Sequence, residues 1–174
     1  MASDSRYMTG LFHDRESAEQ AYQGAIDRGY SRDDVNLVMS DDTRKRHFDN
    51  AAGQETELGN KAAEGAGVGA GIGGTLGAIA AAVAAVGTSI AIPGLGLVVA
   101  GPIAAALAGA GAGGAAGGLV GALVGWGIPE ERVKHYEKGV KEGGILMGLK
   151  TRNDEDAEHL ENHWRTSRGS DIYR

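Results

Sequence analysis

A tract of 65 consecutive residues, 65–129, contains no Asp, Glu, Lys, Arg or His, although the chain has a formal net charge of −6. The tract also holds 20 of the 30 glycines. All charged side chains therefore belong to the two flanks, residues 1–64 and 130–174. A flexible linker tolerates glycine, but it would expose the many Ile, Val and Leu side chains of this tract to water. The tract must therefore pack against itself, against other copies of the chain or against lipid.

Small residues recur every fourth position on both sides of a Pro-Gly turn in the tract. This pattern predicts two apolar helices, 65–91 and 102–127, each about 40 Å long at ~1.5 Å per residue, against the ~30 Å hydrocarbon core of a bilayer. A row of small side chains one turn apart lets a second helix approach closely. We therefore predict a glycine-zipper helical hairpin. The expected helix-packing residues are Gly65, Gly69, Gly73, Gly77, Gly101, Gly109, Gly113, Gly117, Gly121 and Gly125, and the expected turn contains Pro93, Gly94, Gly96 and Pro102.

Two environments suit such a hairpin. Trp126 ends the second helix, where an interfacial aromatic residue is expected, and Lys61 and Arg132 flank the helices while the turn has no cation. This arrangement favours insertion into the inner membrane with both flanks in the cytoplasm. Glycine and alanine make the helices only weakly lipophilic, so the same pattern suits hairpins buried at the centre of a cytosolic homo-oligomer, as a compartment or lipid carrier. Both alternatives predict self-association.

The two charged flanks together have the pattern of one small α/β domain. Short apolar runs alternate with amphipathic segments that begin at capping residues and end at glycine. Without the insertion, their order approaches the β-α-β-β-α-β ferredoxin-like sandwich. We therefore expect an α+β fold in which residues 1–61 and 129–174 form the domain and 62–128 form the helical hairpin. The predicted strands are 7–12, 35–40, 145–151 and 170–173, and the predicted helices are 15–28, 129–142 and 153–167.

Composition excludes several classes of function. The chain has no cysteine, which excludes disulfides, Cys-based zinc sites and thiol chemistry. The N-terminus has no cationic region followed by an apolar core, so a secretory signal is not expected. The acidic balance argues against nucleic-acid binding. Gly69, Gly71 and Gly74 match G-x-G-x-x-G, but no acidic residue follows until Glu130, so no dinucleotide or other cofactor is expected.

The flanks contain a few residues that chemistry could use. His159, His163 and Glu155 recur at helical spacing and could face one metal ion, although a solvated helix face is the favoured interpretation. His13 and Asp14 could form a general-base pair, but Asp14 fits a helix cap better. We expect no catalytic residue and no metal site, and the sequence identifies no small-molecule ligand. An enzyme on the flanks would need a pocket of convergent polar groups, which no motif indicates.

Charged runs in the first flank have simple explanations. The pairs at 33–34 and 41–42 are acidic, but no regular calcium-binding loop follows either pair, so turn and surface positions are favoured. Residues 44–47, Arg-Lys-Arg-His, could contact anionic lipid headgroups if the hairpin inserts, or could form a solvated loop.

Two stretches resemble bacterial general stress proteins. Residues 7–44 contain D-x-x-x-A-E-x-A and R-G-Y-x-x-x-D-V, similar to the opening of the heat-induced general-stress domain. Residues 92–147 contain the I-P-G-x-G turn and the G-I-P-E-E helix start of the low-temperature-induced proteins, with Leu97 where many of those proteins have proline. The resemblance extends from about Met8 to Lys150. It implies a stress-associated, non-enzymatic protein, and it transfers no catalytic residue.

Overall fold

The computed structural model describes residues 7–49, 90–92, 96–101, 123 and 128–174, and within them the chain has an α+β fold. A short 3₁₀ turn, Arg32–Asp34, precedes β2, and a π-helical turn, Lys45–Asp49, follows α2. The strands are β1 (Tyr7–Phe12), β2 (Val35–Ser40), β3 (Ile90–Ile92), β4 (Leu97–Ala100), β5 (Ile145–Lys150) and β6 (Ser170–Tyr173), and the helices are α1 (Arg15–Asp27), α2 (Asp41–Arg44), α8 (Glu130–Lys141) and α9 (Asp154–Thr166).

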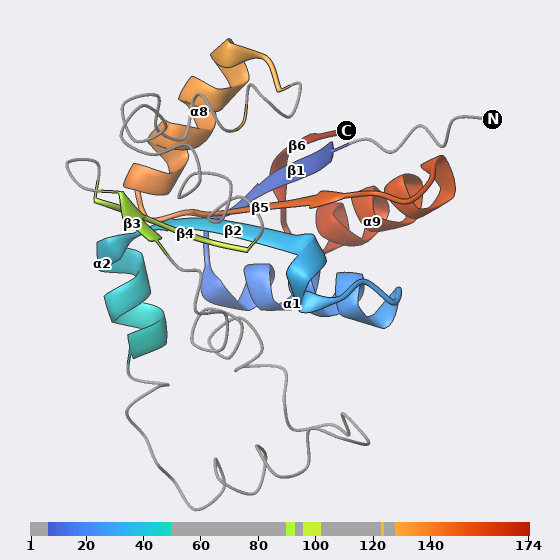
Figure 1. The fold of residues 1–174 in the computed structure, drawn as a ribbon, viewed down its shortest axis with the longest axis horizontal. Coiled ribbons are helices and arrows are strands. Elements are labelled where there is room, and N and C mark those ends of the chain that lie inside the picture. The colour runs from blue at the N-terminus through green and yellow to red at the C-terminus, as the bar shows by residue number, and fades with distance from the viewer. Residues whose placement is uncertain (1–6, 50–89, 93–95, 102–122, 124–127) are drawn as a thin grey trace, which may run out of the picture.

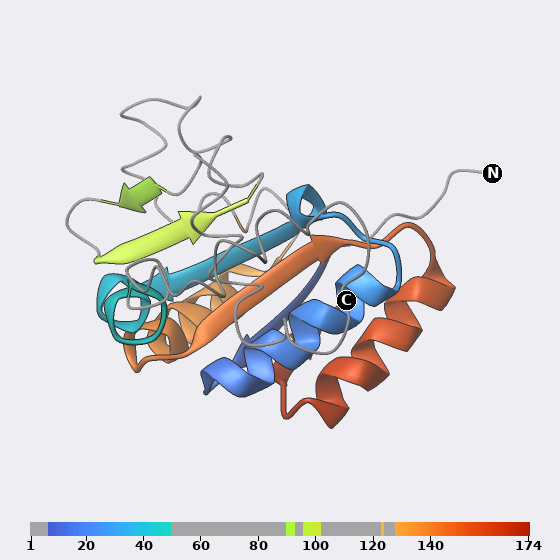
Figure 2. The same cartoon turned by 90° about the horizontal axis from the view of Figure 1, so that it is seen from below.

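The six strands form one sheet in the order β3-β4-β2-β5-β1-β6. Each neighbouring pair is antiparallel. Helices α1 and α9 lie side by side on one face of the sheet, and α8 lies on the other (Figures 1 and 2). Because β1 and β2 both run antiparallel to β5, they are parallel to each other and α1 connects them. Helix α9 connects β5 to β6 in the same way, so the flanks contain two β-α-β units.

The predicted elements of both flanks are confirmed, because local capping and periodicity define them. The side chain of Asp14 accepts a 2.8 Å hydrogen bond from the backbone N–H of Ser17 and so begins α1. Asn153 caps α9 in the same way, with 2.7 Å to the backbone nitrogen of Asp156. Gly29 follows α1 with a φ of 88°, a conformation that suits glycine.

The centre of the uncharged tract differs from the prediction. Residues 90–92 and 97–100 are strands that pair in antiparallel orientation, with Ile92 opposite Leu97. Strand β4 in turn pairs with β2, with Leu37 opposite Ala100. The predicted turn therefore connects two strands and not two helices, and the α/β domain includes a part of the interval assigned to the hairpin. Pairing with β2 satisfies the backbone hydrogen bonds of β4, which outweighs the weak helix preference of a Val-Val sequence.

The position of Gly101 also differs from the prediction. It was expected to continue the helical row of small residues, but it directly follows β4 with a φ of 100°. A Cβ atom at this position would lie 2.5 Å from the carbonyl oxygen of Val35. Gly101 therefore ends the strand at a close backbone approach. Gly96, an expected turn residue, has a φ of 62°, and its carbonyl accepts a 2.7 Å hydrogen bond from the backbone of Asp41.

Each face of the sheet has its own hydrophobic core. On the face of α1 and α9, Trp164 is fully buried, meets the ring of Phe12 edge-on at 5.5 Å, and donates to the carbonyl of Ala21 at 3.2 Å. On the other face, α8 contributes three buried residues to a separate core. This second core contains Leu11, Val38, Leu97, Val99, Leu123, Ile128, Val133, Tyr136, Val140 and Leu146.

We expect Gly101→Ala to lower stability by roughly 2–3 kcal/mol, because a methyl group at this φ meets the Val35 carbonyl. Gly96→Ala is the matched control, since Gly96 also has a positive φ but has open space around its Cβ position. The control should lose only about 1 kcal/mol. Thermal unfolding followed by circular dichroism measures both losses. Equal losses would contradict the close approach of Gly101 to β2.

Candidate functional site

The candidate site is the part of the α/β domain from which the two glycine-rich segments extend. Gly96 and Gly101 are the expected site residues that the structure describes. The others lie outside the described residues: Gly65, Gly69, Gly73, Gly77, Pro93, Gly94, Pro102, Gly109, Gly113, Gly117, Gly121, Gly125 and Trp126. What the structure does define is the pair of points at which each segment leaves the domain and rejoins it.

Both segments are attached to the same sheet at each end. Residues 50–89 connect the π-helical turn after α2 to β3, which belongs to the sheet. Residues 102–122 connect Gly101, at the end of β4, to Leu123. Leu123 is 1% exposed and belongs to the second core together with Leu97 and Val99. The backbone N–H of Ile128 then donates to the Leu123 carbonyl at 3.2 Å. The second segment therefore begins and ends on the domain.

These attachments change the topology expected for a membrane hairpin. Residues 92–96 were expected at the tip farthest from the domain, but β3 and β4 hold this turn in the sheet. A segment with both ends on one domain cannot cross a bilayer a single time, because its ends would then lie on opposite sides. Within the described residues, no helix combines the length and the apolar character needed to cross a membrane.

Two of the histidines singled out in the sequence, His13 and His163, have structural partners. Nε2 of His163 lies 2.9 Å from the carbonyl oxygen of Gln20, and Glu155 pairs with Arg28 at 3.1 Å. In the part of the chain that the structure describes, no three His, Asp or Glu side chains form a group that could hold a metal ion. Nε2 of His13 lies 3.0 Å from Oγ of Ser170. The chain therefore uses His13 and His163 to connect elements that are distant in sequence.

Asp14 is confirmed as a helix cap. Burial raises the pKa of its carboxyl group, but the hydrogen bonds from the backbone and side chain of Ser17 lower it more, with a contribution from Arg168. The net pKa lies below the ordinary value, as expected for a carboxylate that accepts hydrogen bonds at a helix N-terminus. Asp14 is thus ionised for capping and not for proton transfer.

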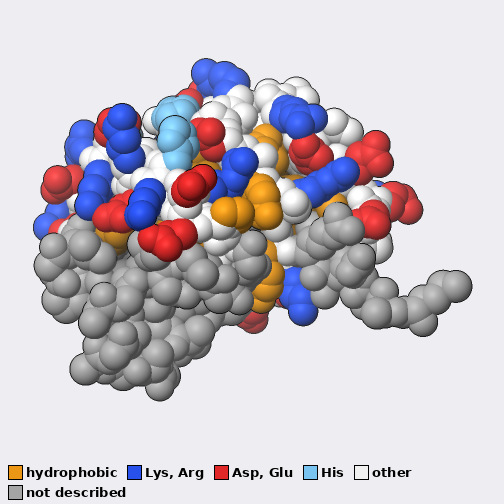
Figure 3. Space-filling view, turned by 90° about the horizontal axis from the view of Figure 1, so that it is seen from above, with side chains coloured by type: hydrophobic (Ala, Val, Ile, Leu, Met, Phe, Trp, Pro, Cys, Tyr) orange, Lys and Arg blue, Asp and Glu red, His pale blue; other side chains and the backbone are white. Residues whose placement is uncertain are grey.

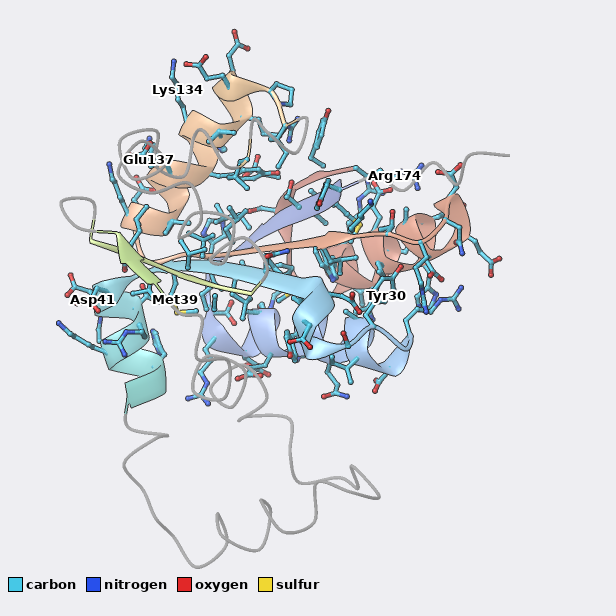
Figure 4. The ribbon with its side chains drawn as sticks, viewed as in Figure 1. Tyr30, Met39, Asp41, Lys134, Glu137 and Arg174 are labelled. Carbon is cyan, nitrogen blue, oxygen red and sulfur yellow. The ribbon has the colours of Figure 1, made fainter. Side chains whose placement is uncertain are left out.

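A buried carboxylate, Asp156, forms the strongest polar cluster of the described residues, and sequence reasoning missed it. Its side chain is 6% exposed and accepts from three donors. Nε of Arg28 lies at 2.7 Å, the hydroxyl of Tyr30 at 2.9 Å and Nε of Arg152 at 2.9 Å. The Arg152 guanidinium also stacks over the Tyr30 ring at 4.2 Å. The cluster joins the end of α1 to the start of α9, and Figure 4 shows Tyr30 where these elements meet.

Burial raises the pKa of Asp156, but hydrogen bonds from Arg28, Tyr30 and Arg152 outweigh this effect and hold the pKa below its ordinary value. The carboxylate is therefore charged at neutral pH and accepts hydrogen bonds from three side chains. These hydrogen bonds connect the end of α1 to the start of α9.

The described surface contains interspersed charges. Lys, Arg, Asp and Glu side chains alternate over the face drawn in Figure 3, so this face has no extended cationic patch. Several pairs lie four residues apart on one helix, such as Lys134 with Glu130 at 2.9 Å and Lys141 with Glu137 at 2.6 Å. This face lacks the clustered cations that phosphate binding requires.

Comparison of the chain with family models, curated proteins and solved structures gives no match.

We expect Asp156→Asn to lower stability by about 2–3 kcal/mol near pH 7, because it removes charge-assisted hydrogen bonds from two arginines. The pKa of Asp156 in the folded state lies below its unfolded-state value of ~3.9. The stabilisation by the carboxylate is therefore complete above the unfolded-state pKa and is lost as pH falls through the folded-state pKa. Unfolding experiments from pH 7 to 3 should show the difference from the natural chain shrinking below about pH 4. Asp154→Asn, at an exposed position in the same helical turn, is the control and should cost under about 0.5 kcal/mol. A pH-independent difference would contradict the ionic role of Asp156.

Proposed function

We propose that the chain is a non-enzymatic structural protein that self-associates through its two glycine-rich segments. In this proposal the α/β domain holds each segment by both ends and presents it to other copies of the chain. The observation that supports it best is the pairing of β4 with β2 together with the burial of Leu123. These contacts attach the uncharged tract to the domain in its middle and near its C-terminal end.

The energetics of glycine support packing between copies. Each glycine inside a helix costs ~1 kcal/mol relative to alanine, so isolated glycine-rich helices are unstable in water. Close contact between helix backbones offsets this cost, because rows of small residues allow a shorter distance between helix axes. A second copy provides an identical row, and identical surfaces form closed, symmetric assemblies.

We also propose that the domain is a ferredoxin-like sandwich extended at one edge. The strand order β2-β5-β1-β6 and the two β-α-β units formed by α1 and α9 support this assignment. Strands β3 and β4 add a hairpin beyond β2. The role in a general stress response rests on the resemblance of residues 7–44 and 92–147 to bacterial stress proteins.

Association with the inner-membrane surface is the alternative. Segments attached at both ends would enter the headgroup region and return to the same side. Arg46, which is exposed and lies shortly before residue 50, would then be placed near anionic lipid. Flotation of the full chain with anionic vesicles at neutral pH distinguishes surface association from a soluble homo-oligomer. Flotation supports the membrane alternative, whereas a large particle that stays with the soluble fraction supports the homo-oligomer.

We expect Gly117→Leu to reduce the assembly mass of the full chain measured by light scattering, because a leucine would fill the groove of the glycine row. Gly111→Leu is the matched control. Gly111 lies four residues from Leu107 and eight from Leu119, in a row that already contains large side chains. The control should keep the assembly mass of the natural chain. Unchanged mass in Gly117→Leu, or equal loss in both variants, would contradict assembly through the glycine row.

A further inference from the structure

Three helices of the domain end in the same hydrogen-bond motif, but one of them ends with an unusual residue. In this motif a backbone N–H donates to the carbonyl five residues earlier, and the residue before the donor adopts a left-handed conformation that glycine favours. That residue is Gly29 after α1 and Gly143 after α8, with φ of 88° and 105°. After α9 it is Arg168, with a φ of 61°. The three hydrogen bonds join Tyr30 to Ala25 (3.1 Å), Gly144 to Gly139 (2.9 Å) and Gly169 to Trp164 (2.8 Å).

A second non-glycine residue with a positive φ lies in the last strand, β6. Among the residues that the structure describes, Arg168 and Asp171 are the two non-glycine residues with a positive φ. Asp171 lies in a bulge, because Ser170 and Tyr173 of β6 are opposite Leu11 and Thr9 of β1, so β6 has one extra residue. An L-residue with a Cβ atom is destabilised in the left-handed region. Backbone strain in the described residues is therefore concentrated in residues 168–174, which we name the C-terminal segment.

Side chains from other elements hold this segment against β1. The hydroxyl of Tyr136, on α8, donates to the Asp171 carbonyl at 2.5 Å and lies 3.0 Å from Oγ1 of Thr9. Each residue of the strand is half-buried or exposed, so these contacts and a short backbone pairing fix its position. Further contacts include His13 with Ser170 (3.0 Å), His135 with Asp171 (3.2 Å), Arg132 over the Tyr173 ring (4.8 Å) and Glu161 with Arg174 (3.3 Å).

We infer that the C-terminal segment exchanges between two copies of the chain, so that β6 of one copy pairs with β1 of the other. The exchange recreates the contacts of residues 170–174, because the partner is an identical chain. It also lets Arg168 leave its left-handed conformation when the connection 167–169 extends between the copies. Strained connections of this kind favour domain swapping. Strand β6 is at the edge of the sheet, next to β1, so its release leaves the other strand pairs intact (Figure 1).

This interface uses residues outside the glycine-rich segments, so it extends the proposed function and does not depend on it. Exchange of the C-terminal segment would link copies in pairs through their α/β domains. The glycine rows would link copies through a separate surface. The two kinds of contact can therefore be removed independently.

Disulfide trapping in the full chain tests the exchange, because the natural chain has no cysteine. One preparation has Thr9→Cys and the other has Tyr173→Cys, two positions that face each other across β1 and β6. One preparation has a fusion tag that changes its mass, so that the heterodimer separates from both homodimers. The preparations are mixed, incubated and oxidised, and heterodimers are quantified on a non-reducing gel. We expect at least about tenfold more heterodimer than with the control mixture of Thr9→Cys and Asp33→Cys, since residue 33 is exposed and lies outside the sheet. Equal yields in the two mixtures would overturn the exchange.

The contribution of strain is tested with Arg168→Gly and Arg168→Ala in the Tyr173→Cys preparation. Both variants lose the exposed pairs with Asp14 at 3.5 Å and Glu16 at 3.7 Å, but only glycine removes the strain. We expect Arg168→Gly to give about 5- to 30-fold less heterodimer than Arg168→Ala. Equal yields would overturn strain as the cause of exchange.

Adding Gly117→Leu to both trapping preparations separates the two proposals. If exchange is independent of the glycine rows, heterodimer yield is unchanged while assembly mass falls. Loss of the heterodimer in this background would overturn the exchange as an independent interface. Unchanged assembly mass with the heterodimer retained assigns the failure to the glycine rows, whereas reduced assembly mass with no heterodimer in either background assigns it to the exchange.

Discussion

The pairing of β4 with β2 determines how the rest of the chain can be arranged. Four consecutive residues of β4 lie opposite Leu37, Val38, Met39 and Ser40, and the same residues contribute side chains to both cores. This pairing holds the middle of the uncharged tract in a domain formed by the two charged flanks. The tract is thereby divided into two shorter segments, each of which must leave the domain and return to it. A long hairpin with a distant tip is excluded by the same hydrogen bonds.

The domain that holds the segments depends on a second long-range contact. The end of α1 and the start of α9 are brought together by Asp156, which is 128 residues from Arg28 in the sequence and accepts from it at 2.7 Å. A buried carboxylate without donors would separate these helices, because burial alone destabilises its charge. With Arg28, Tyr30 and Arg152 as donors, the charge is retained and α1 and α9 stay together over the sheet. Trp164 then fills the space between α9 and β1.

Local sequence patterns were sufficient to predict the secondary structure of the flanks but not that of the centre of the uncharged tract. Asp14, Asn153 and Gly29 mark helix ends through interactions within a few residues, so their positions could be predicted directly. Residues 90–92 and 97–100 are short apolar runs, and such runs fit a strand and a buried helix equally well. Their assignment depends on the free edge of β2, which no local pattern reports. Gly101 shows the same limitation, because its place in a four-residue row is coincidental and its left-handed conformation comes from contact with Val35.

The candidate site and the C-terminal segment differ in chemistry, and this difference follows from how charge is distributed along the chain. Residues 65–89 and 102–122 have no charged group, so contacts between them depend on packing distance alone. The C-terminal segment is held by His135, Arg132 and Glu161, and its backbone is strained at Arg168 although Gly169 is the next residue. A glycine at position 168 would fit the helix end as Gly29 and Gly143 fit theirs. Because arginine stands there, the closed arrangement of β6 on its own chain has backbone strain, which the proposed exchange would relieve while keeping the contacts of residues 170–174.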